Sequence, residues 1–267
     1  MHTVLIGIGS TFLYIVASLL LGLRLKNRDS SASSKLKPIA IAAVAAFLHM
    51  LVLSQMLFSP AGLNLGLFNA ISLLAWFISL LIIVGSVSRP AENVGIVLFP
   101  VAAVTVVLEQ LFHTRYITET AKTTIEIHIL FSILAYSLLT IAAVQAVLVA
   151  IQNHHLRNKR PGGFIRALPP LQTMESLLFQ VIGLGFALQS LSLFSGILFI
   201  EDIFAQHLVH KTVLSFIAWL VFGILLWGRW RFGWRGRTAI RWTLSGFAAL
   251  VLAYVGVKLV LEVILGI

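Results

Sequence analysis

The stretch HLVHKTVLSFIAWLVFGILLWGRWRFGWRGR, residues 207–237, decides the fold of this chain. It opens with His207 and His210, which share one face of a helix because residues three apart are helical neighbours. From Val213 to Trp227 it carries no formally charged residue, and it ends in a cluster of arginines and tryptophans. An apolar core, a tryptophan belt and a basic flank in this order are typical of a membrane span whose basic end lies in the cytoplasm. The two histidines are therefore expected at the outer mouth of a membrane helix.

The composition of the whole chain also predicts a membrane protein. Hydrophobic residues make up 59% of the 267 residues, and charged residues only 10%. A soluble domain of this size has no core large enough to bury so much apolar surface. The net charge of +10 is interpreted as a topology signal, so nucleic acid is not an expected partner. The absence of cysteine excludes disulfides, iron–sulfur clusters and thiolate metal sites.

Apolar segments long enough to cross a bilayer, roughly 20 residues for about 30 Å of hydrocarbon, recur along the chain. The sequence predicts an all-α, polytopic membrane protein with eight transmembrane helices in a single membrane domain, residues 1–267. The predicted spans are about 4–23, 38–57, 65–86, 94–112, 127–151, 177–200, 211–228 and 242–265. Because no positively charged segment precedes the first span, it is expected to be retained and not cleaved as a signal peptide.

The positive charges predict how the chain crosses the membrane. The loops after spans one, three, five and seven hold 15 of the 19 lysines and arginines. The other side holds Arg115, Lys122, Lys211 and Lys258. Since basic loops stay in the cytoplasm, the sequence predicts that both termini lie outside, in the periplasm of a bacterial inner membrane.

The histidines gather on the predicted outer side. Five of the eight lie on the outer face or in the outer half of a span: His49, His113, His128, His207 and His210. A histidine within a span is costly in lipid and is by default a functional-site candidate. His49 lies about eight residues, roughly 12 Å, below the outer end of span two, and the other interpretation for it is a hydrogen bond to a neighbouring helix. His128 begins span five, with Ser132 and Tyr136 beneath it on the same face. Imidazoles from two helix ends can supply both axial ligands of a haem iron.

Other functions remain open at this point. A zinc site would draw on His and carboxylate ligands, here Glu201, Asp202, His207 and His210. Outer histidines and acidic residues also fit an accessory subunit of a divalent-cation (Mg/Co-type) transport system. A path for protons or cations requires carboxylates deep in the spans, and Glu109 lies only about three residues from the outer end of span four, which counts against an ion pump. A membrane scaffold that has lost its ligand is the third hypothesis.

Several blocks of sequence carry a family resemblance. FLHMLVL (47–53) and LNLGLFNAISLLAW (63–76) look like a span histidine and its following helix. IHILFSILAYSLL (127–139) looks like a helix that carries an external histidine. The later blocks are LPPLQTMESLLFQVIGLGFALQSLSLFSGILF (168–199), KTVLSFIAWLVFGILL (211–226) and GWRGR (233–237). In this order the blocks resemble the cytochrome c assembly membrane protein superfamily, the haem-handling proteins of the CcsA, CcmC and HemX type.

The resemblance implies a haem-binding integral inner-membrane protein involved in haem handling or cytochrome c assembly-type processes. It implies a non-covalent, b-type haem held near the outer face. It gives His49 the role of the intramembrane haem ligand or gate, and His128 that of the first external axial ligand. The expected partners are the lipid bilayer, haem, and other membrane or periplasmic proteins.

The chain departs from the family pattern at three places. The tryptophan-rich WWD segment that presents haem in the lyases is expected just before Lys211, where EDIFAQHLVH stands. The second external histidine is expected after the last helix, but the sequence there is LEVILGI. Trp227 replaces a histidine near the inner end of span seven. Lyase activity is therefore not carried over, and no catalytic residue is predicted. From position alone, His210 or His207 is the candidate second axial ligand, with basic outer residues meeting the haem propionates.

Overall fold

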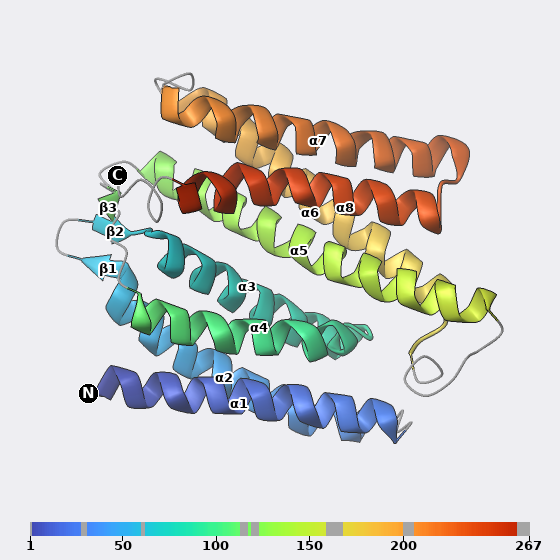
Figure 1. Ribbon diagram of the computed structural model, residues 1–267, viewed down its shortest axis with the longest axis horizontal. Coiled ribbons are helices and arrows are strands. Elements are labelled where there is room, and N and C mark those ends of the chain that lie inside the picture. The colour runs from blue at the N-terminus through green and yellow to red at the C-terminus, as the bar shows by residue number, and fades with distance from the viewer. Residues whose placement is uncertain are drawn as a thin grey trace. The chain divides into compact units, whose positions relative to one another are not determined.

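The computed structural model describes residues 2–27, 31–59, 62–112, 117–118, 123–158, 168–199 and 206–260. In this part of the chain, eight helices are long and apolar enough to cross a membrane, which confirms the predicted all-α fold with eight spans (Figure 1). The chain divides into two compact units. Unit one is Met1–Glu119 with Pro161–Pro169, and unit two is Thr120–Arg160 with Pro170–Ile267. The periplasmic placement of the termini stays a prediction.

Unit one is a ring of four helices. Its helices are α1 (His2–Lys26), α2 (Ala32–Leu57), α3 (Leu67–Ser88) and α4 (Glu92–Leu111). α1 packs against α2 and α4, and α3 packs against the same two helices, which closes the ring. The aromatic rings of Tyr14 and Phe99 stack in its interior with no exposed surface. The ring therefore presents its polar residues inward at one common centre.

A small antiparallel sheet lies where α2 ends and α3 begins, at a position for which the sequence predicted only an uncharged turn. Its strands are β1 (Phe58–Ser59), β2 (Gly62–Asn64) and β3 (Ile117–Thr118), with β2 in the middle. Two- and three-residue strands have too little alternation for a sequence pattern to reveal them.

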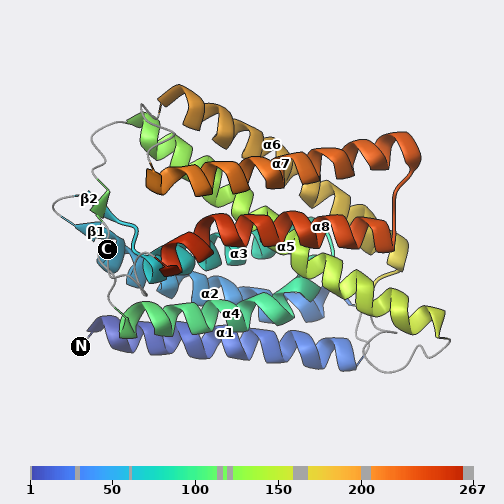
Figure 2. The ribbon, with the colours of Figure 1, turned by 45° about the horizontal axis from the view of Figure 1, so that its top comes forward.

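Unit two is a second ring of four helices. They are α5 (Thr123–Arg157), α6 (Leu171–Phe199), α7 (Gln206–Phe232) and α8 (Arg237–Val251). Each packs against the next, and α5 also packs against α8 (Figure 2). The core contains Leu139, Leu178 and Phe222, each without exposed surface. α8 begins before the predicted span 242–265 and continues as a π-helix, Leu252–Gly256, that the sequence did not predict. Such segments hold an extra residue per turn and are frequent at functional sites.

The first and third helices of the two units carry identical or closely similar polar and aromatic side chains at the same spacing. α1 has Ser10, Tyr14 and Ser18 where α5 has Ser132, Tyr136 and Thr140. α3 contains Ser72-Leu-Leu-Ala-Trp76, and α7 contains Ser215-Phe-Ile-Ala-Trp219. Each of these two tryptophans donates its indole N–H to the second helix of its own unit, at 2.8 Å from Ala46 O and from Ser190 Oγ. The units are therefore repeats of one four-helix pattern.

The second helices differ at one informative position of this repeat. In unit one, His49 on α2 lies 2.8 Å from Ser72 Oγ. In unit two, Gln189 on α6 donates to the backbone oxygen of Ser215 at 3.1 Å. Each second helix therefore contacts the repeated serine of its third helix, through His49 at a hydroxyl in unit one and through Gln189 at a backbone oxygen in unit two.

Close packing inside unit two gives a first testable prediction at Gly246 on α8. A Cβ at Gly246 would lie 2.9 Å from the ring of Phe222, which is fully buried, and 3.1 Å from Val221 Cγ1. The variant Gly246→Leu is expected to lower the free energy of unfolding by about 1–3 kcal/mol, because the core has no room for the added atoms. Gly183→Leu is the control, since a Cβ at Gly183 meets nothing within 4 Å. Thermal unfolding in detergent measures the difference, and equal melting temperatures would contradict this packing.

Candidate functional site

His49 is the centre of a buried hydrogen-bonded chain in unit one. The side chain has no exposed surface. Its Nε2 lies 2.8 Å from Ser72 Oγ on α3, and its Nδ1 lies 3.4 Å from Tyr14 Oη on α1. Ser72 Oγ in turn donates to Glu109 Oε2 on α4 at 2.6 Å. Each of the four helices therefore contributes one side chain to a single polar chain.

The donors in this chain can be assigned in order. Because the Ser72 hydroxyl gives its hydrogen to Glu109, its oxygen accepts from His49 Nε2–H. His49 Nδ1 then accepts from the Tyr14 hydroxyl. All three hydrogen bonds point toward Glu109, whose Oε1 is buried and has no hydrogen-bond partner among the described residues. The Oε1 atom of Glu109 is therefore the last atom of this series of hydrogen-bonded side chains.

This geometry makes Glu109 part of the candidate site and shows the contacts of His49. The sequence predicted only that Glu109 lies near the outer end of span four. In the structure only 1% of Glu109 is exposed, and it is linked to His49 through Ser72. The alternative interpretation of His49, a hydrogen bond to a neighbouring helix, is what the structure shows. Both ring nitrogens are engaged, so metal ligation by His49 requires that one of these bonds break.

His128 has a different environment, at the start of α5 in unit two. The imidazole is half-buried, and its Nδ1 lies 3.0 Å from both Ser192 O and Ser195 Oγ on α6. Since a carbonyl oxygen only accepts, Nδ1 carries the ring proton and Nε2 keeps its lone pair. Ser132, one turn below, donates to His128 O at 2.8 Å and lies 2.7 Å from Ser192 Oγ. His128 is thus fixed by its contacts to α6, and Nε2 is the ring nitrogen that keeps a lone pair.

This arrangement is the one that metal-ligating histidines use. Such a histidine almost always donates its other ring N–H to a carbonyl or carboxylate, which sets the tautomer and the ring orientation. Ser192 and Ser195 supply these contacts here, and sequence reasoning missed both. The signal was present in the run SLSLFS (190–195), which places three serines in an otherwise apolar span.

The remaining predicted ligands lie around the start of α7. His210 is exposed on the first turns of this helix. His207 belongs to α7, but its side chain lies outside the described residues, as do His113, Glu201 and Asp202. Within the described ranges, no group of three or more histidine or acidic side chains is placed to hold a metal ion. Of the four predicted site residues, His49 belongs to unit one and the other three to unit two.

Comparisons with known proteins place these residues in a family. Residues 38–265 match the family model described as Cytochrome C assembly protein. The chain is 32% identical over 230 residues to the inner membrane protein YpjD of Escherichia coli (strain K12), which covers 84% of this chain and 86% of that protein. It is 38% identical over 144 residues to the 28.8 kDa protein in the nifR3-like 5′ region of Azospirillum brasilense, which covers 53% of each.

A further match is the cytochrome c biogenesis protein CcsA of Gloeothece citriformis, 28% identical over 113 residues, or 42% of this chain and 34% of that protein. No solved structure matches the chain. The predicted inner-membrane location is confirmed by the likeness to YpjD together with the eight membrane-spanning helices. From the family model, which covers spans two to eight, the chain belongs to the cytochrome c assembly protein family.

Proposed function

We propose that this protein binds haem in the membrane and takes part in haem handling of the cytochrome c assembly type. The observation that carries the proposal is the orientation of His128, whose Nδ1–H is held by Ser192 while Nε2 keeps its lone pair. Neutral imidazole held in this way is a common axial ligand of haem iron. Membership of the cytochrome c assembly family supports haem as the ligand. The haem is non-covalent and b-type, because a chain with no cysteine has no thiol for thioether attachment.

His210 is the proposed second axial ligand, with His207 as the alternative. α5 and α7 are separated by the antiparallel α6, so both helices begin at the same end of unit two (Figure 2). His128 lies within the first two turns of α5, and His210 lies in the first two turns of α7. Imidazoles from these two helix ends would hold the iron at that end of the unit. In this proposal it is the end that faces the periplasm.

His49 is proposed as a deeper ligand or gate for haem in unit one. Its ring becomes available to iron only when its bond to Ser72 or to Tyr14 breaks. Such a site binds haem only after a change of hydrogen bonding. This behaviour suits a protein that passes haem on more than one that stores it. No catalytic residue is proposed.

The test is an absorption spectrum of the detergent-purified protein, oxidised and dithionite-reduced, with haem supplied during expression. The wild type is expected to show a Soret band and sharp reduced α and β bands. His128→Ala is expected to lose most of the Soret absorbance because the iron loses its oriented ligand. His210→Ala is expected to keep haem but to lose the sharp bands of a bis-histidine iron.

His154→Ala is the control, because His154 is exposed at the far end of α5, where its side chain contacts Asn158 and His155. Size-exclusion profiles identical to wild type show that each variant is folded. A flat wild-type spectrum, or a His128→Ala spectrum equal to wild type, would contradict the proposal. That result would favour the divalent-cation accessory subunit or the scaffold, to be separated by metal-binding measurements.

A further inference from the structure

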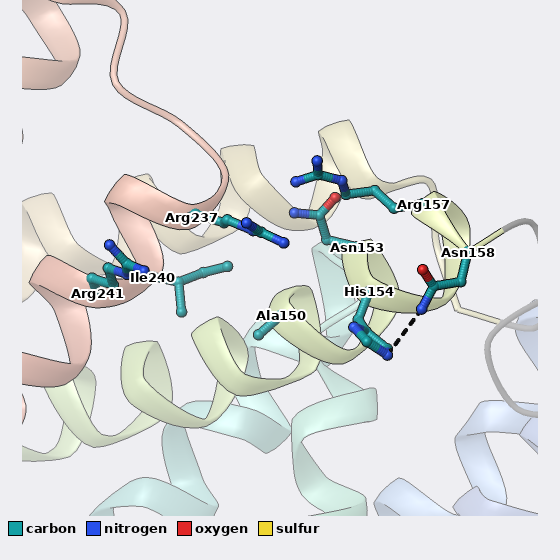
Figure 3. A pocket seen from close by; sticks show the side chains of 8 residues that line it. All are labelled: Ala150, Asn153, His154, Arg157, Asn158, Arg237, Ile240 and Arg241. Atoms are coloured by element: carbon teal, nitrogen blue, oxygen red, sulfur yellow. Dashed lines mark hydrogen bonds between the residues drawn. The ribbon is translucent and has the colours of Figure 1, made fainter.

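A charged cavity lies in unit two between the last turns of α5 and the first turns of α8, away from His128 along α5 (Figure 3). Its volume is about 550 Å³. Its basic lining residues are Arg157 of α5 with Arg237 and Arg241 of α8. Asn153 and Arg237 point toward one another across the cavity, and Arg157 lies beside Asn153 (Figure 3). Asn153 and Arg157 are four residues apart on α5, as are Arg237 and Arg241 on α8, so each pair lies on one face of its helix.

The described lining of this cavity carries positive charge without a counter-ion. None of the three arginine side chains makes an ion pair or a side-chain hydrogen bond with the described residues. Among the described residues that line the cavity, none is acidic. The nearby carboxylate of Glu175 accepts the backbone N–H of Gly236 at 2.9 Å and lies outside the lining. Three guanidinium groups gathered in this way repel one another unless an anion lies among them.

The backbone of α8 adds to the attraction for an anion. Helix α8 begins at Arg237, so the two arginines of α8 occupy its first turns. Gly236 stands at the N-cap position and has no side chain to cap this end, and its own N–H is taken by Glu175. The first N–H groups of a helix lack partners within the helix, and together with the helix dipole they favour negative charge.

The position of the cavity along the membrane normal indicates which anion it meets. α5 has 35 residues, which corresponds to about 52 Å of helix against about 30 Å of hydrocarbon. Its last turns therefore extend into the region of lipid headgroups, where phosphate is the abundant anion. Arginine binds phosphate by paired, charge-assisted hydrogen bonds, and three arginines match its several oxygens.

We propose that α5 and α8 form a binding site for a phosphate group, carried by an anionic phospholipid headgroup or by a soluble phosphate. The site is independent of the haem proposal, because it uses other residues at the other end of α5. Asn153 donates an amide hydrogen to the phosphate, and the buried, apolar side chain of Ile240 lines the same cavity.

The test uses the full-length protein in phosphatidylcholine nanodiscs, with two probes. The first probe is tetraoleoyl cardiolipin added as a minor lipid, and native mass spectrometry counts the cardiolipin that stays bound. The second is inorganic phosphate titrated in the absence of anionic lipid, followed by thermal unfolding. The variant Arg157→Gln/Arg237→Gln/Arg241→Gln removes the three guanidinium groups. The control Lys26→Gln/Lys37→Gln/Arg235→Gln removes the same charge from exposed residues outside the cavity.

Whichever probe binds the wild type, cardiolipin or inorganic phosphate, we expect the cavity variant to bind it at least about tenfold more weakly. The control variant is expected to bind it within about twofold of wild type. Loss with cardiolipin identifies a lipid headgroup as the source of the phosphate, and loss with inorganic phosphate alone identifies a soluble one. Equal loss in both variants would show a diffuse charge effect and overturn the site. Binding of neither probe to the wild type would also overturn it. All six positions are exposed, and size-exclusion profiles confirm that the variants fold.

Discussion

The variant Ser72→Ala is expected to lower the free energy of unfolding by roughly 2–5 kcal/mol, because it breaks the buried chain of unit one at its middle. The change leaves His49 Nε2–H and Glu109 Oε2 without their shared hydroxyl. Neither group can reach water, since His49 has no exposed surface and Glu109 has 1%. Glu109 would then have both carboxylate oxygens unpaired, as its Oε1 already has no partner among the described residues.

The matched control is Ser86→Ala on the same helix. Ser86 is 1% exposed, and its Oγ donates to Ile82 O of its own helix, so its loss strands no second side chain. This control is expected to cost less than about 1 kcal/mol. Equilibrium unfolding in mixed micelles measures both variants. Similar losses for Ser72→Ala and Ser86→Ala would show that the polar chain of unit one adds nothing beyond local packing.

A second large effect is expected at His49, where alanine and glutamine should differ. His49→Ala removes the acceptor of the Tyr14 hydroxyl and the donor to Ser72 Oγ, and it opens a cavity, at a cost of about 3 kcal/mol. His49→Gln is expected to stay within about 1 kcal/mol of wild type. The reason is that a glutamine side chain offers both a donor and an acceptor, as the imidazole does, to the hydroxyls of Tyr14 and Ser72.

The absorption spectrum of these variants separates packing from ligation at His49. Thermal unfolding first establishes that His49→Gln is as stable as predicted. A stable His49→Gln protein with altered haem absorbance then identifies the imidazole nitrogen as a ligand, because glutamine preserves the contact but not the ligating ring. If His49→Gln proves as unstable as His49→Ala, an amide does not replace the imidazole in this hydrogen-bonded network.

The spans were predictable because hydrophobicity alone marks them. The apolar segment 65–86 became α3, Leu67–Ser88, and 94–112 became α4, Glu92–Leu111. The first and last residues of the helices were harder to predict, because a helix continues past the hydrocarbon wherever its backbone hydrogen bonds persist. α5 was predicted as 127–151 and runs from Thr123 to Arg157. The π-helix from Leu252 was not predictable, because its apolar sequence does not distinguish it from the α-helical spans.

The sequence suggested candidate residues for the site, but it did not give their contacts. Sequence spacing predicted that His128, Ser132 and Tyr136 share one face, and His128 and Ser132 both contact Ser192 on α6. The partners on other helices, Ser192 and Glu109, depend on how helices pack, which periodicity along one helix does not contain. A span of equal hydrophobicity has many rotations that bury its apolar side chains, and only the polar contacts distinguish among them.

The polar chain of unit one also has a consequence for biosynthesis. Its members leave the ribosome in the order Tyr14, His49, Ser72 and Glu109, one with each successive helix. A histidine entering lipid without a partner is unfavourable, so α2 gains from finding α1 already in place. Ser72 then meets the Nε2–H of His49, and Glu109 meets the hydroxyl of Ser72. Each helix that enters the membrane thus finds a hydrogen-bonding group on the helix before it, and the network of unit one is complete only once α4 has arrived.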